Sequence, residues 1–181
     1  MYGNPNTTIH WDTIQIIFAA IFAFVFLFAV LLLLVNRYAV KQLTKMNYKN
    51  VLKCKRILLA FNFNPKTVWM VHLILAVASY ETGNEADFIK YINLMKERKA
   101  QPAALCWKAI YMFFKGQEDT FERYFEELKR VVQQEYNEIN IKYVRTLEIL
   151  VKKRNGEYLT EEDMQQIEKS VSKTIKEYIA G

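Results

Sequence analysis

The side chains that most often carry out chemistry are scarce in this sequence, and their spacing does not favour catalysis. His10 lies near the N-terminus and His72 in an apolar stretch, so the two histidines cannot share a metal site. Cys54 and Cys106 belong to no Cys/His ligand spacing, and we interpret both as reduced packing residues. The sequence has no Gly-rich phosphate loop, nucleophile elbow or HExxH motif. We therefore expect no enzyme activity, no cofactor and no bound metal.

A more prominent feature is a stripe of basic side chains at every fourth position: Arg37, Lys41, Lys45, Lys49 and Lys53. On one continuous helix these residues would form a single positive ridge. Such a ridge suits anionic lipid headgroups or an acidic partner, and each basic residue near an anionic leaflet contributes about 1 kcal/mol. The alternative is that these charges only set membrane topology and solubility. Nucleic-acid binding is not favoured, because no recognition motif accompanies the charges.

The net charge of +6 arises entirely from this part of the chain. Residues 36–66 carry eight basic residues and no acidic one, whereas residues 67–181 carry 17 basic and 18 acidic residues. Glutamates in amphipathic stretches such as residues 118–130 alternate with Lys and Arg, which is typical of a solvated helix face.

An uncharged apolar run precedes the basic stripe and covers 22 residues, from Ile14 to Val35. As a helix it would be roughly 33 Å long, which matches a bilayer core of about 30 Å. A cleaved signal peptide is disfavoured, since no basic residue precedes the run and it is too long for a signal core. We predict a transmembrane helix over residues 14–35.

The residues that flank this run predict its direction. Trp11 and Tyr38 bracket it with aromatic rings that favour the headgroup region, and basic residues follow only its C-terminal end. We therefore expect a single-pass protein of the cell membrane, with a short external tail (residues 1–13) and a cytoplasmic C-terminal domain.

The rest of the chain is typical of one helical domain, because it is rich in Leu, Ile, Lys and Glu and poor in Gly and Pro. Gly83 and Gly116 lie 33 positions apart in matching surroundings. Each is preceded by Ala seven residues earlier and is followed by a helical apolar stripe. The two stripes are Phe88, Ile92 and Met95, and Phe121, Phe125 and Leu128. Each unit is predicted to be a helix, a Gly turn and a second helix.

This pattern resembles the tetratricopeptide repeat (TPR), a helical hairpin of about 34 residues. Cys54, Leu58 and Phe61 match the second-helix stripe of an earlier unit. Residues 136–153, the Asn155-Gly156 turn and residues 160–179 predict a further hairpin, with Met164, Ile167 and Val171 facing inward. The predicted fold is all-α: a transmembrane helix and a TPR-like solenoid of about three to four hairpins over residues 48–179. A basic juxtamembrane helix (residues 36–56) would merge into the first repeat.

The chain departs from the family pattern at Phe88 and Phe121, where the repeat usually has a small residue. In the family the first helix of each unit lines a concave groove. The resemblance therefore implies these groove residues: Met70, Leu73, Val77, Tyr80, Ala103, Cys106, Ile110, Phe113 and Phe114. They are mostly apolar and would suit an amphipathic helix or an extended apolar peptide of a partner, although they would equally serve to close the core.

Three functional hypotheses follow. The first is a membrane-attached scaffold or adaptor that binds a protein partner as accessory subunit of a membrane complex. The second is a structural subunit that assembles mainly through its transmembrane helix, in which Ala19 and Ala23 form a small-xxx-small pair. The third is a regulator that binds lipid or nucleic acid through the basic stripe.

Overall fold

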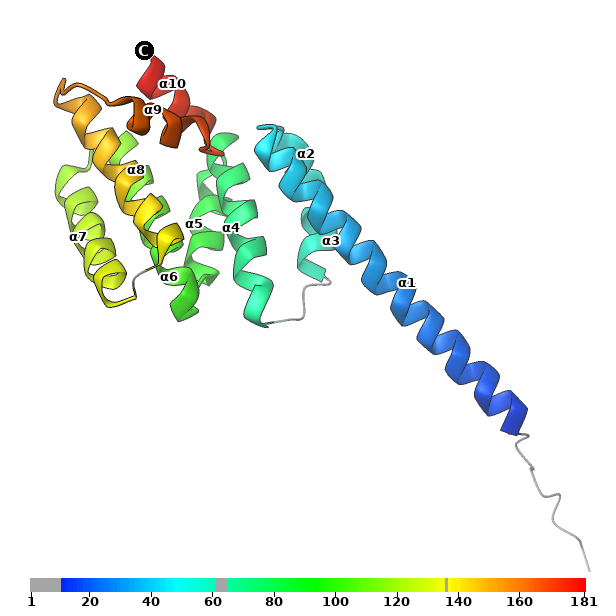
Figure 1. Cartoon of the computed structure of the whole chain (residues 1–181). Coiled ribbons are helices and arrows are strands. Elements are labelled where there is room, and N and C mark those ends of the chain that lie inside the picture. The colour runs from blue at the N-terminus through cyan, green and yellow to red at the C-terminus, as the bar shows by residue number, and fades with distance from the viewer. Residues whose placement is uncertain (1–10, 61–64, 136) are drawn as a thin grey trace, which may run out of the picture.

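A computed structural model of the chain describes residues 11–60, 65–135 and 137–181, and every regular element in these ranges is helical. Figure 1 shows a long N-terminal helix that leads into a compact group of shorter helices. The elements are α1 (Trp11–Thr44), α2 (Tyr48–Lys53), α3 (Lys55–Ala60), α4 (Pro65–Glu81), α5 (Glu85–Leu94), the 3-10 helix η1 (Arg98–Ala100), α6 (Gln101–Phe114), α7 (Glu118–Gln134), α8 (Glu138–Arg154), α9 (Glu161–Glu168) and α10 (Lys173–Ala180).

Helix α1 contains the whole apolar run. Its segment Thr13–Thr44 is long and apolar enough to cross a membrane, and the most apolar part of it is not buried by the rest of the chain. It is therefore not the core helix of this domain. The predicted external tail, with His10, lies outside the described residues, as does the side chain of Trp11.

The three predicted glycine turns are confirmed. Gly83, Gly116 and Gly156 have positive φ angles of 74°, 68° and 72°, a conformation that favours glycine. At each turn the glycine amide donates to the carbonyl three residues back, and the next amide donates to the carbonyl five residues back. For Gly83 these bonds reach Tyr80 at 3.0 Å and, from Asn84, Ser79 at 2.8 Å. The same pair of bonds ends α4, α6 and α8, so each of these helices reverses direction in the same way.

A fourth turn of this kind corrects the prediction of one basic helix over residues 36–56. Met46 has a φ of 57°, its amide donates to Leu43 at 2.9 Å, and the amide of Asn47 donates to Gln42 at 2.8 Å. Helix α1 therefore ends at Thr44, and the chain folds back through α2 and α3. No glycine marks this turn.

The core lies between successive helix pairs. The predicted stripes of α5 and α7 are buried, and so are Ala76 and Ala109 in the preceding helices. Leu58 is buried in α3, whereas Phe61 lies outside the described residues. Helix α4 packs closely against α5, and α6 against α7, so the two matching units are hairpins.

The C-terminal part differs from the predicted single helix over residues 160–179. It consists of α9 and α10, and Ser172 caps α10 by accepting a hydrogen bond from the amide of Ile175 at 3.2 Å. Ile167 is buried and Val171 half-buried, but Met164 is exposed and does not face inward. The break lets the last helix turn back toward the start of the domain.

Candidate functional site

A groove of about 330 Å³ lies among α4, α6, α8 and the C-terminal segment. Four of the predicted groove residues line it together: Leu73 and Val77 from α4, and Cys106 and Ile110 from α6. Leu43, near the end of α1, lies at the same groove. The first helices of the hairpins therefore form a shared apolar surface beside the end of α1.

The other predicted groove residues lie elsewhere. Met70 is exposed one turn before Leu73, and Ala103 is buried in α6. Tyr80 packs against Phe88 and Trp107, with ring centroids 5.4 and 5.7 Å apart. These contacts place Tyr80 between the hairpins.

Phe113 and Phe114 are also occupied by contacts within the domain. Phe113 meets Phe121 at 5.4 Å between ring centroids, and both Phe113 and Phe114 meet Tyr178 of α10 at 5.5 Å. The last helix thus covers this end of α6. Tyr80 and Phe114 line a smaller pocket of about 210 Å³ at the same end.

Sequence reasoning missed the wall of the groove that α8 and the C-terminal segment provide. This wall contributes Ile139, Lys142, Tyr143, Thr146, Gln166, Lys169, Ser170, Val171 and Ile175. Ile139, Tyr143 and Thr146 recur at helical spacing, which was a possible signal for the α8 part of this wall. No local pattern predicts that α10 packs against the same groove. The lining carries two lysines and no acidic residue.

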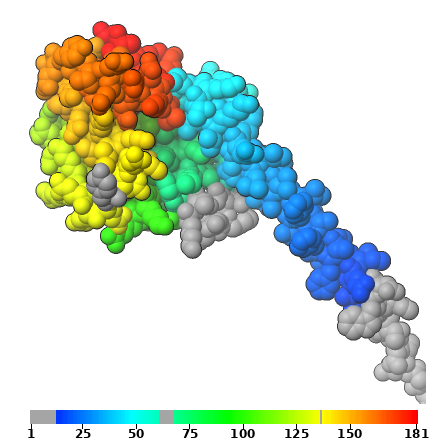
Figure 2. Space-filling view, in the orientation of Figure 1, coloured from blue at the N-terminus to red at the C-terminus, as the bar shows by residue number. Residues whose placement is uncertain are grey.

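The C-terminal segment is fixed over the domain by two side chains from distant parts of the sequence. The hydroxyl of Tyr48 donates to the carbonyl of Val171 and accepts from the amide of Lys173, both at 2.9 Å. Glu81 accepts from the hydroxyl of Ser172 and from the amide and hydroxyl of Thr174, the latter two at 3.1 Å. We call these contacts the clasp; Figure 2 shows the red C-terminal segment against the cyan α2 region.

The Cys106 thiol and the Tyr143 phenol in the groove are held neutral. Burial raises the pKa of the Cys106 thiol far above its ordinary value and raises the pKa of Tyr143 to about 12. The Cys106 Sγ donates to the carbonyl of Tyr143 at 3.8 Å. A thiol in this state is a poor nucleophile, so the groove is suited to noncovalent binding.

His72 packs against Tyr91, with nearly parallel rings 6.2 Å apart. Burial lowers its pKa, which outweighs the opposing attraction of Glu97. Within the described residues, no three His, Cys, Asp or Glu side chains come together as a possible metal site.

The predicted basic stripe is divided between two helices. Arg37 and Lys41 lie on α1, Lys45 lies in the turn, and Lys49 and Lys53 lie on α2. All five are exposed, and none forms an ion pair within the described part of the chain. We call the end of α1 (residues 37–44), the turn at Met46 and helices α2 and α3 the first hairpin. The stripe is thus divided between the two arms of this hairpin and is not a ridge on one helix.

Comparisons of the chain with models of protein families, with characterised proteins and with solved structures found no significant match.

Proposed function

We propose that this protein is a single-pass membrane scaffold whose cytoplasmic, TPR-like domain binds a protein partner in the groove beside the end of its transmembrane helix. It would act by positioning that partner at the membrane as an accessory subunit of a membrane complex. The observation that carries the proposal is the groove itself, an apolar surface that lies next to Leu43 of α1.

The membrane span is supported by the exposure of the apolar part of α1. The largely exposed residues on different sides of the helix include Ile16, Phe18, Phe22 and Phe24. In water this surface would be unfavourable by about 25 cal/mol for each Å². The basic residues that follow Val35 favour a cytoplasmic domain.

The TPR-like assignment is supported by the spacing of the four equivalent turns. Met46, Gly83, Gly116 and Gly156 follow one another at intervals of 37, 33 and 40 residues. The two outer intervals exceed the 34 residues typical of the family. The resemblance is therefore strongest for the two central hairpins.

The groove chemistry favours one kind of occupant, an amphipathic helix of the partner that carries acidic residues beside its apolar face. Apolar side chains of such a helix would enter between Val77 and Ile110, while its carboxylates would lie near Lys142 and Lys169. A volume of about 330 Å³ receives a few side chains and not a whole helix. Attachment to the same membrane would raise the effective concentration of the partner.

The proposal can be tested with two matched substitutions of exposed isoleucines. Ile139 is 59% exposed at the groove, and Ile89 is 45% exposed on α5. The full-length protein is purified from its native membrane in mild detergent with its bound partner. Ile139→Asp should reduce partner recovery at least about tenfold, because it places a charge in the apolar contact, whereas Ile89→Asp should leave recovery unchanged. Equal recovery with both variants would contradict groove binding.

A second function is favoured by α1 itself, whose exposed apolar surface could hold a partner helix within the membrane. Ala19 and Ala23, both exposed, would allow close helix approach. Replacing residues 14–35 with an unrelated transmembrane sequence separates the two functions. Assembly that survives this exchange favours the groove, and assembly that is lost favours the helix.

A further inference from the structure

The second arm of the first hairpin, formed by α2 and α3, runs back toward the apolar part of α1. Helices α2 and α3 cover residues 48–60, which as helices retrace roughly 20 Å from the turn at Met46. The part of α1 between Val35 and Thr44 is only about 14 Å long. Because α3 also contacts α1, its end lies near the last apolar turns of α1.

Packing along α1 agrees with this estimate. Leu43 and Ala39 are buried, and the same face of α1 continues with half-buried Val35 and Leu32. Helix α1 contacts α2, α3 and α4. Figure 1 shows α3 ending, and α4 beginning, on the side of the domain toward which the N-terminal half of α1 extends.

This end of the domain exposes apolar side chains. Ile57 and Leu59 of α3 are each 38% exposed, and Met70, near the start of α4, is 49% exposed. Single exposed apolar residues need no explanation, but these three lie on α3 and α4, which both contact α1.

The charged residues of this part of the sequence are of one sign. Between residues 13 and 80 the sequence contains eight Lys or Arg and no Asp or Glu. Lys55 is neutralised by Asp87 at 2.7 Å, whereas Arg37, Lys53 and Arg56 are exposed and form no ion pair in the described ranges. An anionic lipid surface complements both the charge and the apolar residues.

We propose that Ile57 and Leu59 of α3 and Met70 of α4 insert into the headgroup region of the leaflet from which α1 emerges. This inference rests on the membrane span of the proposed function. The basic residues of α1, α2 and α3 bind anionic headgroups around the inserted side chains. The domain is then attached to the membrane both by α1 and by the inserted side chains. These two attachments fix its orientation and the height of the groove above the lipid.

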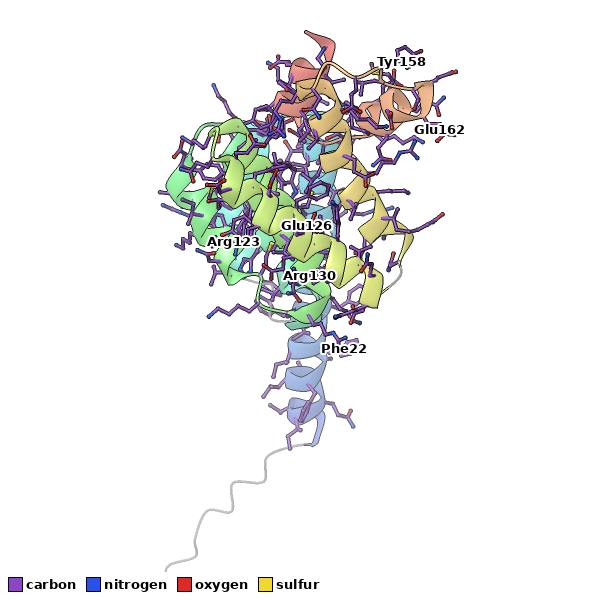
Figure 3. The ribbon with its side chains drawn as sticks, turned by 90° about the vertical axis from the view of Figure 1, so that its left-hand side faces the viewer. Phe22, Arg123, Glu126, Arg130, Tyr158 and Glu162 are labelled. Carbon is purple, nitrogen blue, oxygen red and sulfur yellow. The ribbon has the colours of Figure 1, made fainter. Side chains whose placement is uncertain are left out.

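The test measures the depth of fluorescent labels in reconstituted vesicles. A variant without reactive thiols (Cys54→Ser with Cys106→Ala) receives single cysteines as Leu59→Cys or Met70→Cys. Two reference positions, Phe22→Cys on α1 and Tyr158→Cys at the opposite end of the molecule, are shown in Figure 3. Each label is examined in phosphatidylcholine vesicles with about one third phosphatidylglycerol. One set of vesicles contains lipids with a quencher near the headgroup, and a second set contains lipids with a quencher deep in the acyl chains.

Labels at Leu59 and Met70 should be quenched at least about twofold more than the label at Tyr158, which is 87% exposed. Lys53→Glu with Arg56→Glu should reduce this quenching, whereas the exposed pair on α7, Arg123→Glu with Arg130→Glu, should not.

Two results would overturn the inference, and they are distinguishable. If lipids with a deep quencher act on Phe22 but Leu59 and Met70 behave like Tyr158, the span stands and the domain does not insert. If Phe22 also escapes the deep quencher, the proposed span fails and the inference fails with it.

Discussion

At the scale of single residues, Tyr48 of α2 and Glu81 of α4 are joined by hydrogen bonds to the segment that begins α10. The Tyr48 hydroxyl serves two backbone groups that are 123 and 125 residues away in sequence. Burial and the nearby Glu81 raise the pKa of Tyr48 to about 12, so the phenol keeps its proton for the hydrogen bond to Val171. The clasp therefore holds one wall of the groove in place.

Removing the Tyr48 hydroxyl should weaken this wall. Tyr48→Phe leaves a partly buried carbonyl and amide without their partner, which should lower the free energy of unfolding by about 2 kcal/mol. Urea unfolding of the full chain in mild detergent would measure the change. The matched control is Tyr158→Phe, since Tyr158 is exposed. If both variants unfold at the same urea concentration as the parent, the clasp contributes no stability.

His72 should make stability depend on pH. Its folded-state pKa is lowered, so the unfolded chain takes up a proton at a higher pH than the folded chain. The free energy of unfolding should fall as the pH drops below about 6.5 and should stop falling below the folded-state pKa. His72→Gln should reduce this slope. Denaturation at pH 7.5 and at pH 5.5 would measure it, and an identical slope in parent and variant would contradict the prediction.

Among the elements, the glycine turns were the most predictable feature. A glycine after an amphipathic helix indicates a left-handed turn from local chemistry alone, and Gly83, Gly116 and Gly156 behave accordingly. The turn at Met46 was missed, because a methionine at positive φ has no such signal. The break before α10 was also missed. Ser172, which caps α10, is a local signal for it, whereas the contacts with Tyr48 and Glu81 come from distant parts of the sequence.

The same limit applies to the groove. Leu73, Val77, Cys106 and Ile110 could be predicted, because their helical spacing and the repeat offset place them on one surface. The aromatic residues of that prediction pack within the domain, since Phe88 and Tyr178 approach them from other helices. Such approaches depend on tertiary packing and leave no local pattern.

The Gly116 turn offers a test at the scale of the element. A Cβ at Gly116 would meet no atom within 4 Å, so any effect of Gly116→Ala is due to the backbone and not to a clash. With a φ of 68°, the alanine variant should lose about 1 kcal/mol of stability in urea unfolding. Gly116→Asn should lose less, because asparagine tolerates this conformation better. Equal stability of the parent and both variants would contradict a strained turn.

At the scale of the whole molecule, the end of the proposed membrane helix, the groove and the clasp are neighbours. The groove opens beside the end of α1, and the clasp fixes the wall of the groove that the C-terminal segment provides. Helices α2 and α3, which carry basic residues, contact α1. A partner helix in the same membrane would meet the groove as it leaves the bilayer. This arrangement is the physical reason to expect a scaffold whose partner is itself a membrane protein.

Photo-crosslinking in the native membrane tests this arrangement most directly. A photoreactive phenylalanine derivative is placed, one position at a time, at Ile139 in the groove, at Phe22 on α1 and at Tyr158 on the α8–α9 turn. We predict a single protein adduct from Ile139 that is absent from Tyr158 and is lost when the neighbouring Lys142 and Lys169 are replaced by Glu. An adduct from Phe22 with none from Ile139 would contradict the account and would show that the partner is held by the helix in the membrane.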